Sequence, residues 1–166
     1  MHNTIFLDMD GVLSDLDKHV RSLIGKSLHE FPTSQEGWDA VQPYNDTFFR
    51  DMEPMPDAYE LYDGVQDAAM AYGFAVCVLT AIPKLGRMPT ARLQKHQWID
   101  NHFPNLSCDF HIGPHAQHKQ LHCIPGDILI DDNMMNIDQW NAVGGFGIYH
   151  TSAAESLAIL RKHLEK

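Results

Sequence analysis

A short apolar run that ends in two acids and a glycine constrains the fold of this chain more than any other stretch. Residues 5–11 read IFLDMDG. Such a run is typical of a buried strand in a parallel sheet, and open α/β sheets bind their ligands at the carboxyl edge of such strands. Because the chain can turn sharply at Gly11, Asp8 and Asp10 can both face one pocket there. The stretch therefore predicts an α/β fold with an active site at this edge, although an Asp-Gly pair alone is also a common turn.

Asp8 and Asp10 suit phosphoryl transfer because two carboxylates in different environments can take different roles. Asp8 can attack a phosphorus atom and carry the phosphoryl group as an acyl phosphate. Asp10 can donate a proton to the leaving alkoxide and later accept one from water. We therefore take Asp8 and Asp10 as the candidate catalytic residues of a phosphatase.

A second apolar run ends in a hydroxyl at the same expected edge. Residues 74–79 read FAVCVL, and Thr80 follows them. The Thr80 hydroxyl and the backbone N–H of Ala81 would suit a phosphate oxygen, and Lys84 follows in the same loop. These three residues are candidate phosphate ligands, although a threonine after a strand is commonly just a turn residue.

A third strand end carries paired acids. Residues 127–130 read DILI and are followed by Asp131 and Asp132. Adjacent carboxylates in a pocket repel each other unless a cation or a proton intervenes. Together with Asp8 and Asp10 they predict a site for a hard cation, and Mg²⁺ fits best because it prefers oxygen ligands and substrate phosphate. Four histidines between 111 and 122 match no zinc-binding spacing, so zinc is the weaker alternative.

Composition and charge exclude several classes of function. The 166 residues suffice for one domain with a small insertion, and a net charge of −10 argues against binding to duplex nucleic acid. No apolar stretch approaches the roughly 20 residues of a membrane span. A strand that begins by residue 4 leaves no room for a signal sequence. Three cysteines without a Cys-x-x-Cys pair predict no disulfide framework, so we expect a cytoplasmic protein.

The segment 15–59 differs in character from the rest. It combines a short helical pattern with several prolines and a cluster of aromatic residues. We expect a small helical cap over the end of the first strand, inserted between the two parts of a core, 1–14 and 60–166. Trp38 is the best candidate for contact with a flat ring in a substrate. The alternative is that such aromatics form the small core of the insertion itself.

Beyond residue 60 the patterns alternate between helix and strand. The expected elements are a helix over 63–72, a strand over 74–79, a helix within 86–103, a weak strand over 108–112, a strand over 127–130, a short helix near 137–141 and a strand over 146–150. A capping box from Ser152 to Glu155 then opens a terminal helix. Strands separated by helices imply a parallel sheet with right-handed crossovers.

These strand ends, taken in order, resemble the four motifs of the haloacid dehalogenase superfamily of phosphatases. The matching residues are Asp8-Met-Asp10-Gly-Val, Thr80, Lys119 and Ile130-Asp131-Asp132. Within the superfamily the chain is similar to the 5'(3')-deoxyribonucleotidases. That similarity rests on DMDGVLSD at 8–15, FFRDMEPMP at 48–56, LTA at 79–81 with Lys84, and KHQW at 95–98 followed by His102-Phe103.

The resemblance implies a Rossmann-like, three-layer parallel sheet with a small cap after the first strand. It also implies a Mg²⁺-dependent aspartyl-phosphate mechanism acting on nucleoside monophosphates, typically deoxy and pyrimidine. Asp10 would bind the metal through its backbone carbonyl, and Lys119 would hold phosphate with Thr80 and Ala81. Trp38 would line the base pocket and Lys84 would face the substrate. The resemblance leaves open which of the paired acids binds the metal.

Two other functions remain open from the sequence. One is a phosphatase of the same superfamily that acts on another small phosphate ester. The other is a non-catalytic protein that binds metal or phosphate, which the presence of both Asp8 and Asp10 argues against. Base and sugar preference, the choice between 5' and 3' phosphates, and the oligomeric state, a homodimer included, are also left open.

Overall fold

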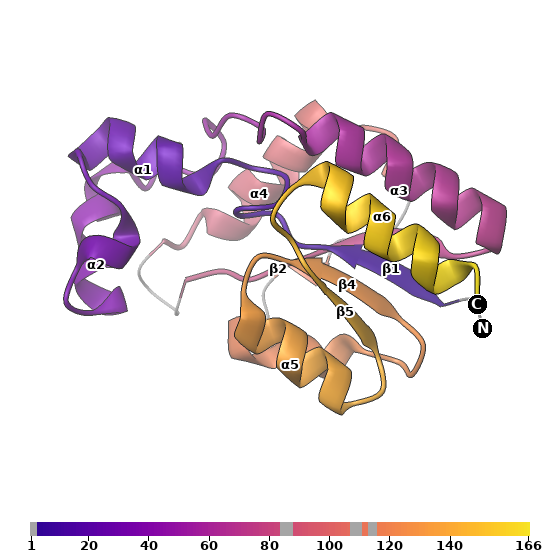
Figure 1. The fold of residues 1–166 in the computed structure, drawn as a ribbon. Helices are drawn as coiled ribbons and strands as arrows, with labels where there is room; N and C mark the ends of the chain where they lie inside the picture. The colour runs from indigo at the N-terminus through magenta and orange to yellow at the C-terminus, as the bar shows by residue number, and fades with distance from the viewer. Residues whose placement is uncertain (1–2, 84–87, 107–110, 113–115) are drawn as a thin grey trace.

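A parallel sheet is the frame on which the rest of the chain is arranged (Figure 1). The computed structural model describes residues 3–83, 88–106, 111–112 and 116–166. Within these residues five strands pair in the order β3-β2-β1-β4-β5, and every pairing is parallel. They are β1 (Thr4–Leu7), β2 (Ala75–Thr80), β3 (His111–Ile112), β4 (Ile128–Asp131) and β5 (Phe146–Tyr149). The expected α/β fold is confirmed.

Helices cover both faces of the sheet. The α-helices of the described residues are α1 (Leu16–Ile24), α2 (Ser34–Val41), α3 (Ala58–Tyr72), α4 (Ala91–His102), α5 (Met134–Ala142) and α6 (Ala153–Leu164), and the 3-10 helices are η1 (Leu28–Glu30), η2 (Gln42–Tyr44) and η3 (Ala116–His122). Figure 1 shows α3 and α6 side by side on one face and α5 on the other. Helices α1 and α2 stand apart, beyond the carboxyl end of β1.

Several element boundaries differ from the expected ones. The helix expected over 63–72 begins earlier, at Ala58, because Ala58 and Leu61 continue its buried face toward the N-terminus. The helix expected within 86–103 is α4, and the last strand ends one residue early, at Tyr149. The strand expected over 108–112 is described only at His111–Ile112, since 108–110 lie outside the described residues.

Strand β1 is buried on both faces, as its continuous apolar run predicts. Ile5 and Leu7 point into the larger core on the side of α3 and α6, whereas Phe6 points into a smaller cluster on the side of α5. The ring of Phe6 meets that of Trp140 edge to face, with 5.4 Å between centroids. Both sides of the sheet therefore hold β1 in place and fix the position of the acids that follow it.

The segment 15–59, for which we expect a cap, contains α1, η1, α2, η2 and the first residues of α3, and its ends pair in a short neck. Asp15 N donates to Glu53 O at 2.8 Å, and Met55 N donates to Leu13 O, also at 2.8 Å. The chain therefore leaves the core and returns to it at neighbouring points.

The aromatic residues of the insertion divide into two kinds. Phe48 and Phe49 are fully buried and pack edge to face at 4.9 Å. They have a packing role, but they join the same large core as β1 and do not form a separate core of the segment 15–59. Trp38 lies 6.2 Å from each of these rings and is only partly buried. One face of Trp38 is consequently available to a pocket.

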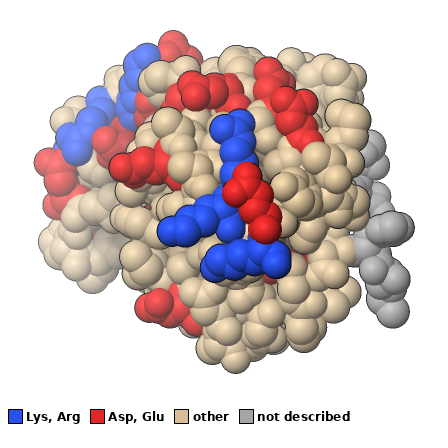
Figure 2. All heavy atoms as spheres, turned by 45° about the vertical axis from the view of Figure 1, so that its right-hand side comes forward, with Lys and Arg blue, Asp and Glu red and all other residues tan. Residues whose placement is uncertain are grey.

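The surface carries mixed charge. On the face shown in Figure 2, Lys and Arg side chains lie in groups beside Asp and Glu side chains. Exposed ion pairs of this kind join Lys18 to Glu53 and Arg21 to Asp17.

None of the helices described here is long and apolar enough to span a membrane. Among the described residues, Cys123 is a free thiol.

Candidate active site

The chain turns sharply where β1 ends. Asp8 N continues the ladder by donating to Ile130 O at 2.9 Å, and Leu13 N then closes a turn onto Met9 O at 2.8 Å. Gly11 lies between them with φ +83°, a conformation that favours glycine. A Cβ at Gly11 would lie 2.1 Å from an oxygen of the Asp132 carboxylate. Any other residue at this position would therefore strain the backbone and displace the Asp132 carboxylate.

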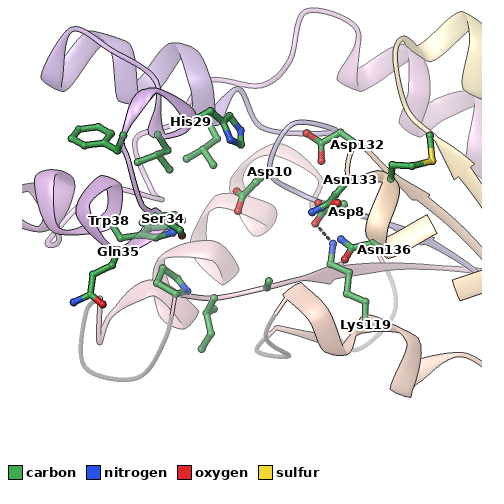
Figure 3. Close-up of a pocket in the computed structure, with 17 residues that line it drawn as sticks. Asp8, Asp10, His29, Ser34, Gln35, Trp38, Lys119, Asp132, Asn133 and Asn136 are labelled. Carbon is green, nitrogen blue, oxygen red and sulfur yellow. Dashed lines mark ion pairs between the residues drawn. The ribbon is translucent and has the colours of Figure 1, made fainter. Parts of the chain in front are cut away.

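A buried lysine pairs with the first acid of this turn (Figure 3). Lys119, on η3, places its Nζ 2.7 Å from Asp8 Oδ1 and 2.6 Å from Asp131 Oδ2. Despite the attraction of Lys119, burial raises the pKa of Asp8 to about 8, and the charge of Asp131 adds to the rise. The site thus holds more buried carboxylates than one lysine can neutralise.

The paired acids at the end of β4 have different surroundings. Asp131 is fully buried, and its two oxygens accept from Lys119 Nζ, from Asn133 N at 2.8 Å and from the Asn136 amide at 3.0 and 3.1 Å. Asp132 instead lines the pocket, and burial together with the charge of Asp131 raises its pKa to about 6. The sequence left these two acids equivalent, and their contacts distinguish them.

An acidic cluster of the kind that binds divalent metals lies at this edge. Among the described residues, Asp8, Asp131 and Asp132 can each place a carboxylate oxygen within 4.8 Å of the other two. The donors are all oxygen atoms, and Lys119 is the one lysine that the described residues place in contact with Asp8 and Asp131. The residues present therefore fit a hard divalent cation.

A second buried lysine, Lys95, contacts residues at the ends of β1 and β2. It was not among the site residues expected from the sequence. Its Nζ donates to Asp10 Oδ2 at 2.5 Å, to Thr80 Oγ1 at 2.7 Å and to Ala81 O at 2.8 Å. Asp10 also accepts from the Ser14 hydroxyl at 3.2 Å. The KHQW stretch that Lys95 begins was the one signal that could have found it.

A pocket of about 840 Å³ opens above these carboxylates. The residues that line it from the core are Asp8, Asp10, Ala81, Ile82, Pro83, Lys119, Asp132, Asn133, Met134 and Asn136, and those from the insertion are Leu16, Leu28, His29, Phe31, Ser34, Gln35 and Trp38. Figure 3 shows Trp38, Ser34 and Gln35 across the pocket from Asp8 and Lys119. The pocket is thus acidic on one side and mixed aromatic and polar on the other.

The structure brings most of the expected site residues to one place. Asp8, Asp10, Ala81, Lys119, Asp132 and Trp38 all line the pocket. Thr80 and Asp131 are fully buried behind its wall and do not line it. Lys84 lies outside the described residues. The lining residues His29, Ser34 and Gln35 were not anticipated, because polar residues on a short helical segment carry no local signal of function.

Comparisons with known proteins bear on the family and the fold. A family model described as "5' nucleotidase, deoxy (Pyrimidine), cytosolic type C protein" matches residues 2–161. A hydrolase from Streptococcus pneumoniae TIGR4 has a TM-score of 0.54 and 11% identity, with 99% of both chains covered. L-2-haloacid dehalogenase from Xanthobacter autotrophicus has a TM-score of 0.50 and 10% identity, with 89% of this chain and 76% of that one covered. No curated protein sequence matches the chain.

At identities this low the two solved structures show the fold alone, which is that of haloacid dehalogenase-type hydrolases. The family model covers nearly the whole chain and includes every acid of the pocket. The chain therefore belongs to the 5' nucleotidase, deoxy (Pyrimidine), cytosolic type C family, and it is a phosphatase whose fold is similar to that of L-2-haloacid dehalogenase.

Proposed function

We propose that this protein hydrolyses (deoxy)nucleoside 5'- or 3'-monophosphates to nucleoside and phosphate, with Mg²⁺, through an aspartyl-phosphate intermediate. One observation carries the proposal. A single pocket holds two acids of a strand end, Asp8 and Asp10, opposite a partly exposed tryptophan, Trp38. The acids suit phosphoryl transfer, and the indole suits a base.

Asp8 is proposed as the nucleophile. Its carboxylate attacks phosphorus, forming the Asp8–phosphate bond as the bond to the nucleoside oxygen breaks. Met9 N donates to Asp8 Oδ1 at 2.8 Å and Lys119 holds the same oxygen, so the carboxylate has a fixed orientation. The transferred phosphate is proposed to be held by Lys119, by the backbone N–H of Ala81 and by Thr80.

Asp10 is proposed as the acid and base. It lines the pocket beside Asp8, where it can protonate the leaving nucleoside oxygen and then take a proton from the water that hydrolyses the aspartyl phosphate. Its oxygens accept from Lys95 and Ser14, so its orientation is defined before substrate binds.

Asp8, Asp132 and the backbone carbonyl of Asp10 are proposed to hold Mg²⁺. The ion supplies positive charge that lets an anionic carboxylate approach an anionic phosphate. Asp131 is left as the partner of Lys119, because its oxygens already accept from neighbouring donors.

The segment 15–59 is proposed to act as the cap and to bind the nucleoside over a core formed by 1–14 and 60–166. Leu16, Leu28 and Trp38 offer apolar and aromatic surface on the insertion side of the pocket. The description of the matching family supports a pyrimidine deoxynucleotide and a cytosolic location.

The test is phosphate release from a panel of 5'- and 3'-(deoxy)nucleoside monophosphates and sugar phosphates, with Mg²⁺ and with EDTA. We expect Mg²⁺-dependent release that favours deoxynucleotides. Release only from sugar phosphates would retain the chemistry of Asp8 and reject the base-binding role of the cap. No release from any ester would reject the proposed function and favour a protein that binds metal or phosphate without turnover.

A further inference from the structure

Lys95 is fully buried and all of its hydrogen-bonding capacity is used. An ammonium group has three N–H donors. The structure gives Lys95 Nζ three acceptors, namely Asp10 Oδ2, Thr80 Oγ1 and Ala81 O, at 2.5 to 2.8 Å. The side chain is 0% exposed. The ammonium therefore has one defined position and no free donor for a substrate.

The three acceptors belong to two different strand ends. Asp10 follows β1, and Thr80 and Ala81 lie at the end of β2, whereas Lys95 comes from α4. The ammonium also lies 4.7 Å from the centroid of the Phe49 ring, beneath the insertion. Lys95 thus joins the proposed acid and base to the loop that is proposed to hold phosphate.

The arrangement leaves the reactive face of Asp10 open. The Asp10 side chain is 21% exposed, and it lines the pocket from which Lys95 is excluded. Ser14 donates to the other oxygen, Oδ1, at 3.2 Å. Hydrogen bonds from Lys95 and Ser14 therefore fix the Asp10 carboxylate, and the part of it that lines the pocket remains accessible.

We propose that Lys95 is a positioning residue that fixes the Asp10 carboxylate relative to the phosphate-binding end of β2. The inference rests on the proposed function. Lys95 touches neither substrate nor metal in this role, and it acts through Asp10 and through the Ala81 carbonyl. It differs from Lys119, which lines the pocket and pairs with Asp8.

The alternative is that Lys95 only stabilises the fold, as a buried ion pair can. Two substrates separate the two roles. A nucleoside alkoxide requires a proton from Asp10 to leave, whereas p-nitrophenolate leaves readily without one. Hydrolysis of the aspartyl phosphate requires Asp10 for both substrates, because water must lose a proton in that step.

The experiment compares wild type, Lys95→Met and Gln94→Met. Methionine keeps an unbranched side chain and removes the charge. Gln94 is the matched control because it is buried on the same helix and accepts from Phe49 N at 2.8 Å, with its amide directed at Asn45 O. Its described hydrogen bonds therefore do not involve Asp10. Steady-state rates with thymidine 5'-monophosphate and pre-steady-state release of p-nitrophenolate are measured with Mg²⁺.

For Lys95→Met we expect kcat with the nucleotide to fall roughly 100-fold, the effect of a misplaced catalytic group, with KM nearly unchanged. With p-nitrophenyl phosphate, the first turnover should still release about one nitrophenolate per enzyme, followed by slow turnover. Gln94→Met should lower the melting temperature without either kinetic change. Asp8→Asn should give no first-turnover release, because no aspartyl phosphate can form.

Two results would overturn the inference. One is an equal loss with both substrates and no first-turnover release, as a structural role predicts. The other is wild-type nucleotide turnover by Lys95→Met. Inactive wild type with both substrates is distinguishable from these results, since it rejects the proposed function itself and the inference with it.

Discussion

The two sides of the pocket are built differently. The floor consists of Asp8, Lys119 and Asp132, with Asp131 behind them. Three of these four residues are buried, and Lys119 joins Asp8 to Asp131. The roof, formed by the insertion residues that line the pocket, is only partly buried around Trp38. Charge compensation therefore limits which residues the floor can contain, whereas shape limits those of the roof. We expect changes in the floor to abolish chemistry and changes in the roof to alter substrate choice.

The largest effect should follow from Asp8→Asn in the floor. We expect turnover of every substrate to fall by about 10⁴-fold or more, because the amide cannot form the covalent intermediate. Phosphate release and circular dichroism measure activity and fold.

Asp10→Asn should likewise abolish turnover with the fold intact. Wild-type-like hydrolysis by either variant would contradict the mechanism.

Substitutions of Asp131 and of Asp132 should change the effect of Mg²⁺ on thermal stability in different ways. Asp132→Asn should not lower the metal-free melting temperature, because folding disfavours the Asp132 charge, and it should lose the rise caused by Mg²⁺, a rise equivalent to about 2.7 kcal/mol at one hundred times Kd. Asp131→Asn should lower the metal-free melting temperature, because it removes a buried partner of Lys119, and should keep part of the Mg²⁺ effect. Thermal denaturation with Mg²⁺ and with EDTA distinguishes them. The reverse pattern would exchange the two roles.

A change in the roof should be smaller and selective. Trp38→Ala should raise KM for nucleotides about tenfold, since stacking contributes about 1–3 kcal/mol per base. Turnover of a small sugar phosphate should not change. Tyr44→Ala is the matched control, because Tyr44 is an exposed aromatic of the same insertion that does not line the pocket. Equal losses on nucleotide and sugar phosphate would show that roof and floor are not separable.

A last effect concerns stability without metal and leaves the rate of the metal-loaded enzyme aside. The pKa of Asp8 rises from 3.8 to about 8 on folding, so the native state binds more protons between these values. In EDTA, wild-type stability should therefore decrease as pH rises through this range, and Asp8→Asn should flatten the dependence. Melting temperatures across pH measure it. An identical slope in both proteins would show that the floor tolerates the Asp8 charge.

The floor was largely accessible from sequence because its acids follow short apolar runs that mark strand ends. Lys95 was not, because it lies within an ordinary helical pattern and its partner Asp10 is 85 positions away. The choice between Asp131 and Asp132 also depended on tertiary contacts, namely the donors of Lys119 and Asn136. In the roof, aromatic character singled out Trp38, but exposure and orientation are properties of the fold that composition does not encode.

The paired neck of the insertion gives this architecture a capacity for change. Because Leu13 and Met55 are joined by a backbone hydrogen bond, any segment placed between them starts and ends at neighbouring points of the core. The entropy of closing such a segment rises only slowly with its length. We therefore expect the pocket-lining part of this segment to tolerate changes in length and sequence, whereas Phe48 and Phe49, which share a buried cluster with β1, should not tolerate them.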